Sequence, residues 1–168
     1  MNILICGLNG SGKTTLGKTL ADELGFFFLN DEDYYFLESE IPYTVSRSEE
    51  EAKAFILSKL KQYDSTVIVS VKGNLGADIV KRLDVVVYLS APLDERLSRI
   101  KKREIEKYGN RVLEGGDMYK QQKAFHDFCA SRTPEKILNF LETLSCKVIK
   151  IDGTKPISEN ISHIKMQL

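Results

Sequence analysis

The sequence predicts an α/β fold: a three-layer sandwich in which a five-stranded parallel sheet is flanked by helices, with a helical lid beside it. Two features lead to this prediction. Short apolar runs rich in Val and Ile alternate with longer segments whose apolar residues recur every three or four positions, the pattern of strands alternating with helices. A glycine-rich loop joins the first apolar run to the first helical segment, as in parallel sheets built from strand–helix units. We expect a single domain spanning residues 1–168.

The charge balance excludes several classes of partner. Lys plus Arg and Asp plus Glu both number 24, so no overall basic field favours nucleic acid or a membrane surface. No apolar run approaches the roughly 20 residues of a membrane-spanning helix, and the first residues form a predicted strand rather than a signal peptide. We therefore expect a cytoplasmic protein, monomeric or weakly self-associating, that binds small molecules. Cys6, Cys129 and Cys146 are far apart and predict neither a disulfide framework nor a zinc site.

The first predicted strand, residues 3–6, runs directly into a loop with the spacing G-x-x-x-x-G-K-T. Its glycines let the backbone curl so that several N–H groups converge on one point, and the helix that follows adds its N-terminal dipole. This context predicts a binding site for nucleotide phosphates, with Lys13 meeting the β- and γ-phosphates and Thr14 ligating Mg²⁺. The predicted nucleotide-binding residues are Asn9, Gly10, Ser11, Gly12, Lys13, Thr14 and Thr15.

An acidic D-x-D pattern follows the next predicted elements. A helix over residues 14–24 ends at Gly25, and a short strand then leads into Asp31-Glu32-Asp33. In extended chain Asp31 and Asp33 share one face, and the carboxyl end of a strand is where open α/β sheets bind ligands. We assign Asp31 to Mg²⁺ and Asp33 to accepting a proton from an acceptor hydroxyl. The alternative is an acidic turn that only begins a helix.

Residues 31–64 are expected to form a flap over the site. Its first half has no clear period and carries several aromatic residues, Tyr43 among them. Its second half is a helix that begins with a capping box from Ser48 to Glu51. Arg47 precedes this helix and is a candidate for gripping an anionic acceptor, although pairing with the adjacent acids would explain it equally well.

The third predicted strand, residues 66–71, is a β-branched run that ends at Lys72-Gly73-Asn74, with no Asp or Glu. Lys72 and Gly73 follow this strand end, so we expect them beside the acceptor. A short helix over residues 77–83 and a fourth strand over residues 84–89 complete the middle of the chain.

The most basic part of the chain begins with the helix after Pro92. Glycines bracket a loop within it, so we expect residues 104–119 to form a lid that is mobile without ligand and ordered with it. A helix over residues 118–132, with Phe125 and Phe128 inward, and another beginning near Thr133 follow. The last predicted strand is residues 147–151, and a helix over residues 157–166 closes the chain.

Together these patterns resemble the small P-loop kinases, which include adenylate, cytidylate, shikimate and gluconate kinases, over nearly the whole chain. The resemblance implies a P-loop fold of the nucleotide-kinase type, with Arg103 stacking on adenine and Arg111 and Arg132 neutralising the moving phosphoryl group. Asp31 and Asp33 match the D-x-D of shikimate and gluconate kinases. The resemblance also implies that the tail contacts adenine through Gly153, Thr154, Lys155 and Pro156.

The acceptor side departs from this family. Adenylate kinases carry an Asp-Gly-Phe-Pro-Arg type segment after the third strand and shikimate kinases a glycine triplet, whereas this chain has Lys72-Gly73-Asn74. We expect an ATP- and Mg²⁺-dependent kinase, and the adenylate-kinase-like tail and basic lid favour a nucleoside monophosphate as acceptor. The alternatives are a kinase of a small hydroxyl metabolite and a non-catalytic ATP-binding regulator. A GTPase switch is excluded because the chain has no N-K-x-D motif.

Overall fold

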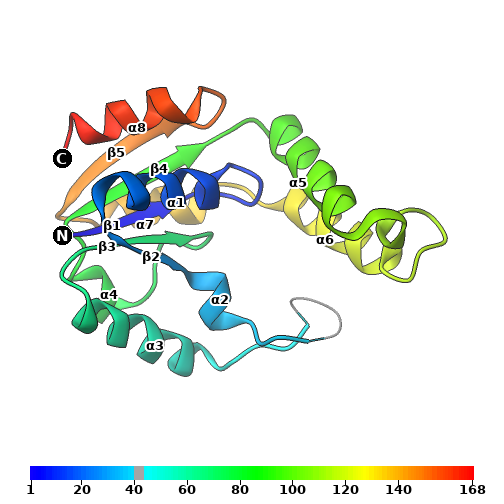
Figure 1. Cartoon of the computed structure of the whole chain (residues 1–168), viewed down its shortest axis with the longest axis horizontal. Coiled ribbons are helices and arrows are strands. Elements are labelled where there is room, and N and C mark those ends of the chain that lie inside the picture. The colour runs from blue at the N-terminus through cyan, green and yellow to red at the C-terminus, as the bar shows by residue number, and fades with distance from the viewer. Residues whose placement is uncertain (40–43) are drawn as a thin grey trace.

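The computed structural model describes residues 1–39 and 44–168 and contains a five-stranded parallel sheet with the strand order β2-β3-β1-β4-β5 (Figure 1). The predicted α/β fold is therefore confirmed, whereas Tyr43 of the expected flap lies outside the described residues. The strands are β1 (Asn2–Cys6), β2 (Phe27–Asn30), β3 (Thr66–Ser70), β4 (Val85–Ser90) and β5 (Lys147–Asp152).

Helices cover both faces of the sheet. Figure 1 shows α1 and α8 on one face, α3, α4 and α7 on the other, and a hairpin of α5 and α6 that projects beyond the carboxyl ends of the strands. None of the helices in the described part of the chain combines the length and apolar character that crossing a membrane requires. The helices are α1 (Lys13–Leu24), α2 (Asp31–Tyr35), α3 (Glu49–Gln62), α4 (Ala77–Val80), α5 (Leu93–Tyr108), the short 3-10 helix η1 (Gly109–Val112), α6 (Tyr119–Ser131), α7 (Glu135–Glu142) and α8 (Ile157–Lys165).

Alternation along the strands divides the core between the two faces. Ile3 and Ile5 of β1 pack in the cluster that includes α1 and α8, whereas Leu4 and Cys6 pack in the cluster that includes α3, α4 and α7. All four side chains are completely buried. Because successive residues of a strand point to opposite faces, a central strand covered on both sides reads as one continuous apolar run.

The strand order creates a crevice at the end of β1. This strand lies between β3 and β4, so the chain passes to one side of it through β2 and β3 and to the other through β4 and β5. Ligands of open α/β sheets bind at such a switch point, outside the carboxyl ends of the strands. The glycine-rich loop begins there, directly after Cys6.

Local signals fix the helices on either side of the crevice. The predicted stop of α1 is confirmed, because Gly25 has a φ of 67° and its N–H bonds to the carbonyl oxygens of Ala21 and Asp22. The predicted capping box of α3 is also confirmed: the Ser48 side chain accepts from the Glu51 N–H, and the Glu51 side chain accepts from the Ser48 N–H. Both ends satisfy backbone groups that a helix terminus leaves unpaired.

Replacing Gly17 with Ala should destabilise the protein, although alanine is the better helix former. The added methyl group would overlap Val69 Cγ1 and lie 3.3 Å from Phe28 Cε2, so α1 would have to move away from the sheet. We expect the free energy of unfolding, measured by urea denaturation, to fall by about 1–3 kcal/mol. Lys18→Ala, at the exposed next position, is the matched control and should change it by less than about 0.5 kcal/mol. Equal stability of Gly17→Ala and the natural protein would contradict this close packing.

Candidate active site

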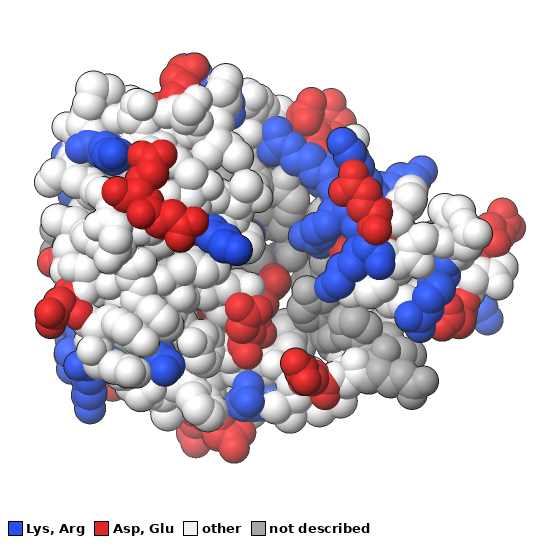
Figure 2. Space-filling view, in the orientation of Figure 1, with Lys and Arg blue, Asp and Glu red and all other residues white. Residues whose placement is uncertain are grey.

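A cleft of about 1860 Å³ opens beyond the carboxyl ends of the strands. Its walls come from the glycine-rich loop, from α2 and α3, from the segment after β3, and from α5, α6 and α7. Figure 2 shows Lys and Arg side chains gathered on the α5 side of this groove, with acidic side chains on the facing side. The cleft therefore has a basic wall, which includes Arg99 and Arg103 of α5, opposite an acidic wall formed by Asp31 and Glu32 of α2.

The glycine-rich loop forms the floor of the cleft. Gly10 and Gly12 have φ values of 80° and 100°, which side chains with a Cβ rarely adopt. The Lys13 side chain is buried and its Nζ donates to the Leu8 carbonyl oxygen at 3.4 Å. Burial lowers the pKa of Lys13 to about 8, although Glu32 and then Asp31 oppose this shift. The Ser11 hydroxyl is also buried and has no partner among the described residues.

Two arginines of α5 hold the loop from one side. Arg96, a buried residue, donates from Nη1 to the Asn9 carbonyl oxygen at 3.2 Å, and Arg99 donates from Nη1 to the Ser11 carbonyl oxygen at 3.3 Å. A Cβ at Gly10 would overlap the Arg96 carbonyl oxygen. Two carbonyl groups of the loop, those of Asn9 and Ser11, are thus bonded to α5, which fixes the loop against this helix.

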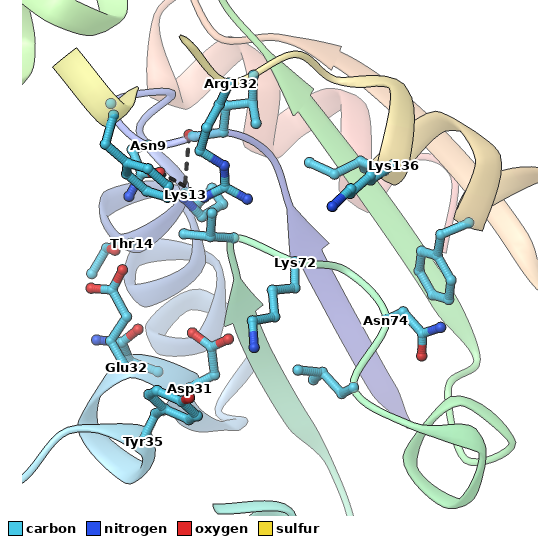
Figure 3. A pocket seen from close by; sticks show the side chains of 18 of the residues that line it. Asn9, Lys13, Thr14, Asp31, Glu32, Tyr35, Lys72, Asn74, Arg132 and Lys136 are labelled. Atoms are coloured by element: carbon cyan, nitrogen blue, oxygen red, sulfur yellow. Dashed lines mark hydrogen bonds between the residues drawn. The ribbon is translucent and has the colours of Figure 1, made fainter. Parts of the chain in front are cut away.

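Arg132, a predicted catalytic residue, lies at the loop. It follows the last residue of α6 and donates from Nη1 to Asn9 Oδ1 at 2.9 Å (Figure 3). The guanidinium carbon lies 5.4 Å from the centre of the Phe128 ring. The tertiary structure therefore places Arg132 at the phosphate loop that carries Asn9 and Lys13, 123 positions from Asn9 in the sequence.

The acidic wall differs from the sequence prediction. Asp31, Glu32 and Asp33 form the first turn of α2, so the expectation that Asp31 and Asp33 share a face of extended chain is wrong. Two residues apart on a helix are rotated by about 200°. Asp31 and Glu32 line the cleft, whereas Asp33 is exposed, accepts a hydrogen bond from Asn30 Nδ2 at 3.0 Å and is not among the lining residues. The alternative interpretation, in which the acidic residues only begin a helix, is therefore correct for Asp33.

Glu32 is a site residue that the sequence analysis missed. It is the strongest of the charges that raise the pKa of Lys13, and Figure 3 shows its side chain extending from α2 toward Thr14. The signal was present in the sequence, because an Asn followed by three acidic residues is typical of a helix start. A helix that begins at Asp31 turns Asp33 away from Asp31, so the two carboxylates do not share a face.

Asp31 is the most perturbed carboxylate of the site. Burial raises its pKa from 3.8 to about 6, and a hydrogen bond with the Ser70 side chain and the charge of Lys13 offset part of this shift. Its Oδ1 is buried and has no hydrogen-bond partner among the described residues. A desolvated, incompletely bonded carboxylate in a cleft is typical of functional positions.

The oxygen atoms near the loop fit Mg²⁺. The Thr14 side chain is exposed to the cleft, and Asp31 and Glu32 supply carboxylates on the facing wall, which are the hard ligands that this cation prefers. Within the described residues, no group of three or more His, Cys, Asp or Glu side chains could form a complete cage. Mg²⁺ does not need one, because it binds through one or two carboxylates together with substrate phosphates.

Two predicted acceptor-site residues do not face the cleft. The Arg47 guanidinium donates from Nη1 to the Tyr34 carbonyl oxygen at 3.0 Å and lies 5.0 Å from the centre of the Phe55 ring. It joins the two halves of the flap, and the expectation that it grips the acceptor is not supported by its position. Gly73 is buried beneath Phe140 and is likewise not among the lining residues.

Two lysines that form no ion pair with any described residue line the acceptor end of the cleft. Lys72, as predicted, lines it, and its Nζ lies 5.1 Å from the centre of the Tyr35 ring. Lys136 of α7, which the sequence analysis missed because it sits in an ordinary amphipathic helix, reaches into the same space (Figure 3). Among the described residues, no carboxylate oxygen lies within 4.0 Å of either ammonium group. Asn74 lines the cleft next to Lys72.

The predicted lid is a helical hairpin whose tip is internally bonded. Residues 104–119 comprise the end of α5, η1 and the turn before α6, and the Met118 N–H bonds to the Arg111 carbonyl oxygen at 2.9 Å. Arg111 pairs with Asp117 at 2.7 Å and is not among the lining residues, so its predicted contact with the phosphoryl group is not supported by its position. Arg103 lines the cleft and pairs with Glu104 at 2.9 Å.

The aromatic residues of α6 and the tail complete the donor side. Phe125 and Phe128 line the cleft. The expectation that Phe128 points inward is wrong, because Phe128 is 54 % exposed. The predicted adenine-contacting turn lies against the loop, because a Cβ at Gly153 would be 2.8 Å from the Ser11 carbonyl oxygen. Thr154 donates to Asp152 and Lys155 pairs with Glu159. Contact of residues 153–156 with adenine stays a prediction.

Comparisons with known proteins agree with this architecture. The AAA_18 family model, described as an AAA domain, matches residues 3–123. The uncharacterized protein YqaC of Bacillus subtilis (strain 168) is 30 % identical over 171 residues, which is 97 % of this chain and 94 % of that protein. A shikimate kinase of Persephonella marina is 33 % identical over 110 residues, or 60 % of this chain and 67 % of that protein.

Solved structures show the same fold. A shikimate kinase from Bacteroides thetaiotaomicron superposes with a TM-score of 0.63 over 99 % of this chain and 97 % of that one, at 16 % identity. The parallel sheet, the glycine-rich loop and the cleft at the strand ends define a P-loop nucleotide-binding protein. More particularly, the chain belongs to the AAA_18 family of AAA domains and is an enzyme of the P-loop kinase superfamily.

Replacing Asp31 with Asn should stabilise the protein above pH 6. The raised pKa means that the fold disfavours the ionised carboxylate, so the free energy of unfolding falls as pH rises from 3.8 to about 6. Removing the charge should raise the melting temperature by about 5 °C at pH 8, and the gain should vanish near pH 4. Melting curves across this range measure it. Asp33→Asn, on the exposed neighbour, should change little at any pH, and equal behaviour of the two variants would contradict the burial of Asp31.

Proposed function

We propose that this P-loop kinase transfers the γ-phosphoryl group of Mg-ATP to the hydroxyl group of a small anionic metabolite. The observation that carries the proposal is that a desolvated carboxylate, Asp31, lies in the same half of the cleft as two lysines, Lys72 and Lys136, for which the described residues supply no ion pair. The carboxylate suits a hydroxyl group that loses a proton, and the lysines suit a negative group elsewhere on the same molecule.

The donor half has the groups that phosphoryl transfer requires. This reaction depends on positioning and on positive charge around the transferred group far more than on covalent chemistry. The loop N–H groups and Lys13 would bind the phosphates, and Arg132 would neutralise the charge on the moving phosphoryl oxygens. Thr14 and Glu32 would hold Mg²⁺, directly or through water, and the cation would offset negative charge on the β- and γ-phosphates. Arg103 and residues 153–156 remain proposed contacts of the adenine.

Asp31 is the proposed base, in place of Asp33. Its pKa of about 6 leaves it ionised at neutral pH yet more basic than an ordinary carboxylate, which suits accepting a proton near pH 7. Oδ1 is buried and has no hydrogen-bond partner among the described residues, so the carboxylate is incompletely hydrogen-bonded, and the residue lines the cleft in which the acceptor would bind. Lys13 and the Ser70 side chain, both of which act on the Asp31 pKa, would keep the carboxylate turned toward the phosphate loop.

The charge of the acceptor end favours an anion. Lys53 also lines the cleft but is neutralised by Glu49 at 2.9 Å, whereas Lys72 and Lys136 have no such partner among the described residues. Two ammonium groups without a close ion pair among the described residues raise the local concentration of anions and stabilise one that binds between them. A carboxylate or a phosphate ester on the acceptor could form ion pairs with both lysines.

A nucleoside monophosphate, which the sequence favoured as acceptor, is the second candidate. The basic lid and the tail support it, but both belong to the donor side. The arginine that adenylate kinases place after the third strand is absent, since that segment reads Lys72-Gly73-Asn74. The identity with shikimate kinases supports a hydroxyl metabolite instead, and Asp31 would serve no purpose in a regulator that only binds ATP.

An acceptor screen tests the choice. Hydroxy acids, phosphorylated polyols, neutral polyols and nucleoside monophosphates are incubated with Mg-ATP, and ADP release is measured together with the phosphorylated product. We expect turnover with an anionic hydroxyl compound and little with neutral polyols, because only an anion engages the lysines. A nucleoside monophosphate as the best acceptor would overturn the proposal, as would product formation that persists in Asp31→Asn.

Lys136→Met should raise the KM for the acceptor about ten-fold, the effect of losing one charge-assisted hydrogen bond. The KM for ATP should stay unchanged because Lys136 lies on the acceptor side. Arg47→Met removes a cation that faces away from the cleft and is the matched control, so its acceptor KM should equal that of the natural protein. Steady-state kinetics with the acceptor from the screen give both constants, and equal KM values for the two variants would contradict the assignment.

A further inference from the structure

Asn9 is held by arginines from two different helical segments that flank the cleft. Its carbonyl oxygen accepts from Arg96 Nη1 at 3.2 Å, and its side-chain Oδ1 accepts from Arg132 Nη1 at 2.9 Å. The second bond joins residues that are 123 positions apart in the chain. Asn9 lies within the glycine-rich loop itself, so it connects the phosphate site directly to the arginine that follows α6.

The surroundings of Arg132 show why it is important that its hydrogen-bond partner, the Asn9 side chain, carries no charge. Burial lowers the pKa of Arg132, and the charge of Arg96 adds to this, while Cys129 opposes it. Among the described residues, no carboxylate oxygen lies within 4.0 Å of its guanidinium group. Phe128 covers the guanidinium at 5.4 Å. The Asn9 amide oxygen therefore orients Arg132 without cancelling its charge.

The hydrogen bond to Asn9 leaves most of the Arg132 guanidinium group free to bind a phosphoryl group. A guanidinium group has five N–H donors in a fixed plane, and the bond to Asn9 uses only one of its terminal nitrogens. The remaining donors can bind phosphoryl oxygens while this bond persists. A carboxylate at the same position would both pair with Arg132 and repel the phosphates.

We propose that Asn9 is a positioning residue that holds Arg132 in place for the γ-phosphoryl group of the bound nucleotide. Its neutral side-chain oxygen fixes one edge of the guanidinium before the nucleotide arrives, so less side-chain freedom is lost when the phosphate binds. The inference rests on the contact between Arg132 and the γ-phosphoryl group proposed above. It does not depend on the identity of the acceptor.

Nucleotide binding tests this without an acceptor. Isothermal titration gives the dissociation constants of Mg-ADP and Mg-AMP-PNP, and their ratio reports contacts with the γ-phosphoryl group alone. Asn9→Ala should reduce the preference for AMP-PNP over ADP about five-fold, the effect of one net hydrogen bond. Arg132→Met should remove at least as much of the preference. In the double variant, Asn9→Ala should add nothing further, because it acts through Arg132.

Each other outcome is decisive. If Arg132→Met keeps the full preference, the proposed phosphoryl contact of Arg132 fails and this inference fails with it. If Arg132→Met loses the preference but Asn9→Ala does not, or if the two effects add independently, Asn9 does not act through Arg132 and only this inference is overturned. Asn9→Asp keeps the acceptor oxygen but adds a negative charge, so it should weaken AMP-PNP more than Asn9→Ala does. Unchanged AMP-PNP binding in Asn9→Asp would also overturn the inference.

Discussion

The close packing of the glycine-rich loop against two other backbone segments is the constraint on which the site depends. A Cβ at Gly7 would overlap the Leu89 carbonyl oxygen at the end of β4, and one at Gly10 would overlap the Arg96 carbonyl oxygen in α5. Glycine therefore does two things in this loop: it permits the turn that gathers N–H groups on one point, and it lets β4 and α5 approach the loop. The bonds from Arg96 and Arg99 then fix the base of the helical hairpin to the phosphate site.

Burying two charged groups in the cleft lowers the stability of the folded protein. Lys13 and Asp31 are both desolvated, which lowers the pKa of the lysine to about 8 and raises that of the carboxylate to about 6. In each case the fold disfavours the charged form that phosphoryl transfer needs. A bound nucleotide would supply the negative charge that Lys13 lacks. Such strain is common at functional sites, where stability is given up for activity.

The two halves of the cleft are specified in different ways. The donor half is built largely from consecutive residues of one loop, so a short motif describes it. The acceptor half is assembled from α2, the segment after β3 and α7, and its charged residues, Asp31, Lys72 and Lys136, come from widely separated parts of the chain. The kinase class can therefore be recognised from the motif, whereas the acceptor depends on side chains that meet only in the folded protein.

The sequence by itself determined the strands, the phosphate loop, the stop at Gly25 and the capping box of α3, because each rests on a pattern of neighbouring residues. Only the tertiary structure decided which charged side chains face the cleft. α2 begins at Asp31, and this turn carries Asp33 away from the cleft while Asp31 and Glu32 line it. Arg47 and Arg111 bond to Tyr34 and Asp117 outside the cleft, and Lys136 enters it from an ordinary helix. The start of α2 has a local signal, the Asn followed by three acidic residues, whereas the directions of Arg47, Arg111 and Lys136 have none. The physical reason is that long-range packing sets the direction of those side chains, and a local motif does not encode it.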